Sequence, residues 1–455
     1  MPPRPTPTTT VEPTPAPSPL AEPVRRTMRM SLIEGGVVQV FLNWTSGSVL
    51  VGYLLALGAS ASHVALVASV PFLAQVASPF AALLAEFVGR RRLLTATMAA
   101  IGRATWILAA FLPQLPIPDA GRPGVLVLLV FVASVFQSAT GTLWTAWMGD
   151  VVPEDRRGRY FGMRTGVLGV IGMVANLAAG AFLDRVAAPL NFQLVLGVSV
   201  VLGGVGVALY FAHHDPPSER RAPSIREVFR GPLADRNFRR FLAFAVYWQF
   251  VVMLGAPFVI PYFLQELAMS FTQVAVWSAI AASTALATTI LWGRAADRVG
   301  NKGVLAIGTF VAGAGLPSCW IAAGLTGDLG FIWASAVFDA IAWGAIGPAM
   351  FNLALVSAPR SGRVAFVAMY ALVAGVAGFL GGVASGGLLT FLQANRPTAW
   401  STTWTGFHSL FVITGVGRML AWVLLRRVEE AKAWRTRDLL RAVRPAWTRL
   451  GLPWR

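Results

Sequence analysis

Two ionisable residues lie deep inside long apolar stretches of the sequence, where a charge is costly. Asp339 lies near the middle of the stretch 329–352, and Arg103 lies about ten residues into the stretch 93–112. A carboxylate there can carry a proton or bind a solute, and Asp339 is the first candidate for either role; a structural hydrogen bond to a neighbouring helix is the alternative. Arg103 can pair with an acid inside the membrane, bind an anionic substrate or tie helices together.

Two further charges lie nearer the ends of such stretches. Glu34 comes early in the stretch 31–57, so it is a candidate gating or protonation site, or else a boundary residue paired with Arg26 or Arg29. Arg418 lies close to the end of the stretch 407–425, and we expect its long side chain to reach the interface between membrane and water.

Neutral polar residues recur at helical spacing in the same stretches. Gln39 and Asn43 are four residues apart and share one helical face, and Gln137, Thr140 and Trp144 form a similar stripe. Tyr247 and Gln249 precede two prolines, Pro257 and Pro261, that can kink a helix. Polar faces of this kind either line a water-filled cavity or hold helices together.

A charged segment, WGRAADRVGNK at 292–302, separates two apolar stretches and has a partial copy at 82–92, ALLAEFVGRRR. An acid at the end of a helix, such as Asp297 or Glu86, can accept hydrogen bonds from neighbouring helix N-termini and pair with arginine. Gly89 and Gly300 suit tight turns between closely spaced backbones. The alternative is that these charges only fix the topology of the chain.

The composition identifies the environment of these groups. The chain has 455 residues, of which 56% are hydrophobic and 13% are charged, with a mean hydropathy of +0.63; a soluble protein carries about a quarter charged residues. The net charge of +17 does not indicate nucleic-acid binding, because the basic residues lie between apolar stretches. Twelve stretches are long enough to span a bilayer: 31–57, 63–85, 93–112, 124–147, 161–184, 192–212, 239–264, 272–292, 303–325, 329–352, 364–392 and 407–425.

The arginines predict the orientation. They concentrate in one set of connections and in both tails, so we expect both termini in the cytoplasm and the protein in a bacterial inner membrane. The predicted organisation is a disordered Pro/Thr-rich tail (1–30), a six-helix bundle (31–212), a cytoplasmic central loop (213–238), a second six-helix bundle (239–425) and a basic amphipathic tail (426–455). The basic tail either docks on anionic lipid headgroups or is solvated.

Three landmarks recur in order at a distance of a little over 200 residues: the two charged segments, VPEDRRGR (152–159) with APRSGR (358–363), and SVFQ (134–137) with AVFD (336–339). With these features the chain resembles the major facilitator superfamily, whose signature between helices 2 and 3 is G-x-L-A-D-R-x-G-R-[RK]. The second copy matches better, and the first has Ala82, Glu86 and Phe87 where the signature has Gly, Asp and Arg.

The resemblance implies an all-α membrane protein with twelve transmembrane helices in two pseudo-symmetric bundles, which works by alternating access. It implies a cytoplasmic latch that closes the outward-open state and is built from Glu86, Gly89, Arg90, Arg91, Asp150, Arg159, Gly293, Asp297, Arg298, Gly300, Lys302 and Arg363. It also implies that spans 1, 4, 7 and 10 line the substrate cavity, with Gln39, Asn43, Gln137, Thr140, Trp144, Tyr247, Gln249, Asp339 and Trp343 as candidate cavity residues.

The sequence offers no phosphate-binding loop, no cluster of metal ligands, no cofactor motif and no catalytic cluster, so an enzyme is not expected. The predicted function is secondary active transport of a small organic solute, coupled to protons through Asp339, Arg103 or Glu34. The direction of transport, and a sugar-like as opposed to an amphipathic solute, stay open. The alternative from another class is a membrane receptor or scaffold of the same fold that does not transport.

Overall fold

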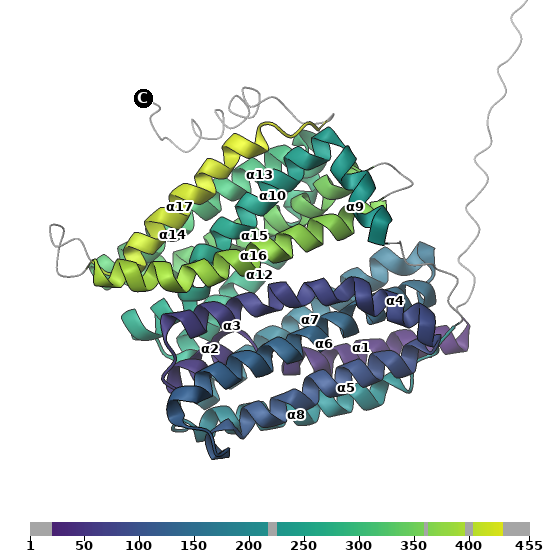
Figure 1. Ribbon diagram of the computed structural model, residues 1–455, viewed down its shortest axis with the longest axis horizontal. Coiled ribbons are helices and arrows are strands. Elements are labelled where there is room, and N and C mark those ends of the chain that lie inside the picture. Colours follow the sequence, from purple (N-terminus) through teal and green to yellow (C-terminus); the bar gives the residue numbers. More distant parts are fainter. Residues whose placement is uncertain (1–20, 217–224, 359–362, 396–403, 431–455) are drawn as a thin grey trace, which may run out of the picture.

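The computed structural model describes residues 21–216, 225–358, 363–395 and 404–430. These residues form helices and connections without a strand. Twelve helical segments are long and apolar enough to cross a membrane. In Figure 1 the helices up to residue 210 form the lower bundle, and the helices from residue 236 form the upper bundle.

The N-terminal half contains six spanning segments. Its helices are α1 (Glu22–Trp44), α2 (Gly47–Ala56), α3 (Ala61–Ala74), α4 (Ser78–Val88), α5 (Arg91–Ala110), α6 (Arg122–Val151), α7 (Glu154–Leu183) and α8 (Leu190–Tyr210). The first span is broken at Thr45 and Ser46, and the second span is bent where Pro71 precedes a short 3-10 turn.

The C-terminal half repeats this pattern. Its helices are α9 (Ile225–Ala234), α10 (Arg236–Gly255), α11 (Val259–Pro261), α12 (Phe271–Val299), α13 (Asn301–Phe310), α14 (Leu316–Thr326), α15 (Gly330–Val356), α16 (Arg363–Ala394) and α17 (Gly406–Leu425). Its first span breaks after Gly255, next to Pro257 and Pro261, as the kink-forming prolines predicted.

Two predicted boundaries need correction. Residues 22–30 are helical and do not belong to a disordered tail, because Pro23 occupies the first turn of α1, where proline is favoured. The central connection is not a plain loop from 213 to 238, because it contains α9 and α10 already begins at Arg236. Residues 1–20 and 431–455, which carry the rest of the predicted tails, lie outside the described residues.

The helix ends define two faces of the molecule. We call the face where α1 begins and where α8 and α17 end the terminal face, and the opposite face the far face. Helix α16 of one half packs on α3 of the other, and α12 packs on α7. Small residues permit the first contact, since a Cβ at Gly375 would lie 2.8 Å from the carbonyl oxygen of Phe72 and one at Gly386 would lie 2.8 Å from Cα of Ser62.

Among the described residues, the two halves pack together near the far face and not near the terminal face. In α12 the exposed residues concentrate between 283 and 298, whereas residues 271–282 are buried or half-buried. In α7 the exposed residues likewise concentrate before residue 172. Helix α4 presents Phe80 and Phe87 with 61% and 89% of their surface exposed, although α3 of the same span is largely buried. Three helices that face the other half therefore lose their burial toward the terminal face.

Candidate functional site

A buried carboxylate lies against an arginine in the N-terminal half. Glu34 of α1 and Arg164 of α7 form an ion pair with 3.7 Å between Oε2 and Nη2, and the glutamate side chain is only 3% exposed. Gly35 makes room for this pair, because a Cβ there would lie 2.4 Å from Nη2 of Arg164. The guanidinium also lies 4.2 Å from the ring centre of Trp144 on α6, which is a cation-π contact.

Arg103 of α5 lies next to this pair and joins two helices. Its Nη1 donates to the carbonyl oxygen of Gly203 on α8 at 2.8 Å, and its Nη2 donates to the hydroxyl of Tyr210 at 3.4 Å. Glu34 is an electrostatic neighbour of Arg103. Of the three roles considered for Arg103, the tie between helices therefore has observed hydrogen bonds.

Four buried polar atoms of this cluster have no hydrogen-bond partner among the described residues: Oε2 of Glu34, Oγ of Ser31, Nε of Arg103 and Nε1 of Trp144. Such atoms are rare in proteins and each is costly if it stays unpaired. The cluster around Glu34 therefore has spare capacity to bind a proton, a water molecule or a polar group of a solute.

The C-terminal half also has an acid and an arginine that influence each other inside the bundle. Asp339 of α15 has Trp343 and Arg418 as its electrostatic neighbours. Arg418 is only 2% exposed, and its Nη1 donates to the carbonyl oxygen of Ala312 at 3.1 Å. The expectation that Arg418 reaches the interface is wrong, because its side chain points into the bundle and ties α17 to the helix preceding α14.

The candidate cavity residues do not all come together. Asn43 accepts a hydrogen bond from Gln39 at 2.6 Å and donates to the carbonyl oxygen of Gly172 at 3.1 Å, so both lie at the contact of α1 with α7. Tyr247 donates to the carbonyl oxygen of Gly417 on α17 at 3.0 Å.

The other candidates divide between the two charged clusters and the helix surfaces. Trp144 belongs to the cluster around Glu34, and Trp343 belongs to the second cluster, which consists of Asp339, Trp343 and Arg418. Thr140 is buried and donates to the carbonyl oxygen of Phe136 within α6 at 2.8 Å. Gln137 is half-buried on α6, and Gln249 is half-buried on α10, close to Gly378 of α16.

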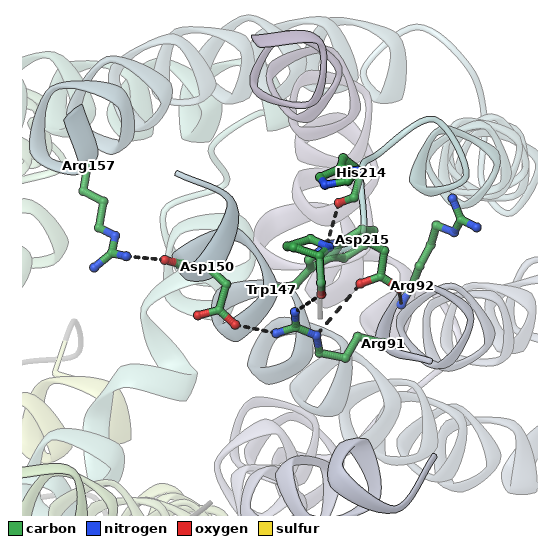
Figure 2. A network of polar contacts seen from close by, with 9 residues as sticks. Arg91, Arg92, Trp147, Asp150, Arg157, His214 and Asp215 are labelled. Carbon is green, nitrogen blue, oxygen red and sulfur yellow. Dashed lines mark hydrogen bonds and ion pairs between the residues drawn. The ribbon is translucent and has the colours of Figure 1, made fainter. Parts of the chain in front are cut away.

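At the terminal face, the rim of the N-terminal half, which is formed by the helix ends and connections there, contains a polar network around Arg91 (Figure 2). Arg91 pairs with Asp150 at 2.6 Å, donates to the carbonyl oxygen of Pro216 at 2.8 Å and lies 3.9 Å from the carboxylate of Asp215. The other oxygen of Asp215 accepts the backbone N–H of Arg92 at 3.2 Å. This carboxylate, which follows α8, therefore caps the N-terminus of α5.

The rim of the C-terminal half contains the same kind of contact, a carboxylate that caps a helix N-terminus. The carboxylate of Glu430 accepts the backbone N–H groups of Asn301 and Lys302 at 3.1 Å and 2.8 Å and the Asn301 side-chain amide at 2.8 Å, so it caps the N-terminus of α13. Nζ of Lys302 donates to the carbonyl oxygens of Arg426 and Val428. Asp215 lies five residues past the end of α8 and Glu430 five residues past the end of α17.

The remaining predicted latch residues lie on the same rim. Gly89 and Gly300 have φ of +63° and +83°, which explains the glycine at both turns. Asp297 is exposed and has no hydrogen bond or ion pair with the described part of the chain. The side chains of Glu86 and Arg363 lie outside the described residues. Exposed latch residues are Arg90, Arg159, Gly293 and Arg298.

Sequence reasoning missed three partners: Arg164, Asp215 and Glu430. Arg164 is an arginine inside the predicted span 161–184, and an arginine inside an apolar span is the signal that identified Arg103. Asp215 and Glu430 could have been found only by comparing the positions that follow the last span of each half.

The sequence model of the Major Facilitator Superfamily matches residues 35–382 and 241–454. A search of the curated proteins found no match.

The fold resembles those of solved transporters. The nucleoside transporter NupG is 14% identical, with a TM-score of 0.68 over 90% of this chain and 100% of that chain. A D-xylose-proton symporter is 16% identical, with a TM-score of 0.68 over 90% and 99%. A bacterial homologue of the human lysosomal transporter Spinster, in an inward-facing and unoccupied conformation, is 16% identical, with a TM-score of 0.66 over 91% and 100%. At these identities the likeness concerns the fold alone.

Proposed function

The chain belongs to the Major Facilitator Superfamily, and from this premise we propose that it is a secondary transporter which moves a small organic solute by alternating access, driven by a proton gradient. One observation carries the proposal: the two halves pack together near the far face and separate toward the terminal face. A central site between such halves communicates with one side of the membrane at a time.

The terminal face is the cytoplasmic face in this proposal. It carries the arginine-rich connections, in keeping with the rule that positive charge stays inside, and the membrane is the inner membrane of a bacterium. The conformation is then inward-open. A membrane-impermeant thiol reagent tests the assignment in a Cys319→Ser background. In intact cells it should react at Ala187→Cys and not at Arg159→Cys; the reverse pattern would overturn the orientation.

Glu34 is our leading proton-coupling residue, and Asp339 is the second candidate. An ionised carboxylate with one buried oxygen that accepts no hydrogen bond is costly, and a proton on Oε2 of Glu34 would remove that buried charge. Arg103 and Arg164 are both close enough to compensate the charge when that proton leaves. The name of the D-xylose-proton symporter is compatible with coupling of this type in a protein of the same fold.

The test is a solute screen in proteoliposomes under an imposed pH gradient. We expect the solute to accumulate inside the proteoliposomes and this accumulation to collapse when an uncoupler is added. Glu34→Gln or Asp339→Asn should abolish the accumulation, while downhill exchange of the solute persists. Asp119→Asn is the matched control, because that carboxyl is 88% exposed in the connection before α6. Accumulation without any pH gradient would refute proton coupling.

The second candidate function is a receptor or scaffold of the same fold. The hydrogen-bonded networks around Arg91 and Glu430 favour it to the extent that they hold each half rigid, but each network joins groups of one half only. Solute binding without flux in every reconstituted condition would support the receptor and overturn the transporter.

A further inference from the structure

The N-terminus of α12 is completed by a residue from the other half of the molecule. Ser270 caps the helix, and its hydroxyl accepts the backbone N–H of Gln273 at 3.1 Å. The two remaining N–H groups of the first turn, those of Phe271 and Thr272, donate to Oδ1 and Oδ2 of Asp184, each at 2.8 Å. Asp184 lies at the end of α7, so both hydrogen bonds join the two halves at the far face.

The packing around these bonds is equally specific. A Cβ at Gly180, one turn before Asp184, would lie 2.7 Å from the carbonyl oxygen of Phe271. The ring of Phe271 occupies a space that a Cβ at Gly52 would fill, at 2.4 Å from the ring, and it meets the ring of Phe192 edge-on with 5.7 Å between ring centres. The first residue of α12 is therefore inserted between α2, α7 and α8 of the N-terminal half.

We propose that Asp184 and the N–H groups of Phe271 and Thr272 form a far-face clasp that holds the transporter closed on the far side and must open in every transport cycle. This inference rests on the proposed alternating access. It goes further because it assigns a role to Asp184, which no sequence motif marks. Asp184 controls the ratio of the state open at the far face to the state open at the terminal face.

The chemistry of the far-face clasp suits a reversible contact. An anion at a helix N-terminus interacts favourably with the exposed N–H groups and with the helix dipole. Burial raises the pKa of the Asp184 carboxyl, but hydrogen bonds from Thr272, Phe271 and Ser270 outweigh this effect and hold the pKa below its ordinary value. The carboxylate thus stays ionised near neutral pH. Because the bonds are exposed, water can replace them when the halves separate, and no buried group is left unpaired.

Ser270 and Gln273 cap the helix reciprocally within their own half, so the helix itself stays formed when Asp184 leaves. Loss of Asp184 should therefore change the balance of conformations more than the stability of the fold.

The experiment measures the far-face distance between two spin labels in the full-length protein in lipid nanodiscs. The labels are attached at Ala187→Cys and Thr326→Cys in a Cys319→Ser background; these exposed positions lie on opposite halves of the far face. The fraction with a long distance reports far-face opening. We expect Asp184→Asn and Asp184→Ala to raise the ratio of long to short distances by about tenfold, the effect of losing a helix cap.

Two further variants make the measurement decisive. Asp328→Asn is the matched control, because Asp328 is also exposed at the far face and accepts the N–H of Gly330 at 2.7 Å, but within its own half. Its ratio should equal that of the wild type. Gly180→Ala should raise the ratio without any change of charge, since the added methyl group meets Phe271.

The outcomes separate this inference from the function on which it rests. If the wild type shows both distances and both Asp184 variants stay within about twofold of its ratio, the far-face clasp is refuted while alternating access stands. If the wild type shows one distance with every solute and at every pH applied, alternating access and the clasp both fail.

Discussion

Replacing Glu430 by glutamine should destabilise the protein far more than the same change at its neighbour Glu429. Glu430 accepts three hydrogen bonds at the N-terminus of α13 and is half-buried. Glutamine keeps one acceptor oxygen, so the variant loses at least one charge-assisted bond, about 1.5 kcal/mol, and the interaction with the helix dipole, about 0.5 kcal/mol. We expect a loss of about 2 kcal/mol in the free energy of unfolding.

Glu429 is the internal control for this prediction. Its side chain is 76% exposed and pairs with Arg240 across the surface, and its bonds to Asn237 use backbone groups that glutamine retains. A surface pair of this kind contributes about 0.5 kcal/mol. Both variants are unfolded from mixed micelles by increasing the denaturing detergent, with helix content as the signal. Equal losses for the two variants would refute the argument that Glu430 completes α13.

Three further predictions concern other groups of the rim and the balance of conformations. Arg91→Gln should cost about 3 kcal/mol, because it removes the ion pair of Arg91 with Asp150 from a site where the carboxylate is only 15% exposed; a loss below about 1 kcal/mol in the same assay would contradict this. His213 is buried between Trp147 and Tyr210, and burial lowers its pKa, so the unfolded state binds a proton that the native state refuses. Stability should therefore fall as the pH drops below about 6.5, and His213→Gln should remove that part of the pH dependence of unfolding. Asp297→Asn should shift the spin-label distances toward a closed far face, opposite in sign to Asp184→Asn, and a shift of the same sign would show that Asp297 is not a latch.

The fold could be predicted from the sequence because its main determinant is local. Every predicted span overlaps an observed one, since about 20 consecutive apolar residues are enough to identify a membrane helix. The predicted helix ends are less accurate than the predicted spans, because the helices continue past the apolar region, where hydropathy gives no signal. At Glu22, for example, Pro23 is a helix-start signal that the proline-rich sequence before it concealed.

The partners of the charged residues could not be predicted in the same way. Glu34 was expected next to Arg26 or Arg29 if it was a boundary residue, but it pairs with Arg164, which lies 130 positions later and is brought close only by the packing of α1 on α7. The space for that pair is created by Gly35, and the sequence alone does not show which side chain would use it. Pairings between helices depend on rotation and depth in the bundle, and composition fixes neither.

A carboxylate accepts backbone N–H groups at a helix N-terminus in three places, and the location of each contact decides its effect. Asp215 caps α5 and Glu430 caps α13, and in both cases the acid and the helix belong to the same half, so these contacts persist whichever way the transporter faces. Asp184 caps α12 across the halves, so its contact exists only while the far face is closed. The latch that the resemblance implies for the terminal face would use the same chemistry on the opposite side. If a latch on each face held at once, neither face could open. In this structure the far-face clasp is engaged, and Asp297 is exposed and forms no hydrogen bond or ion pair with the described residues. This is the arrangement that alternation between the two contacts requires.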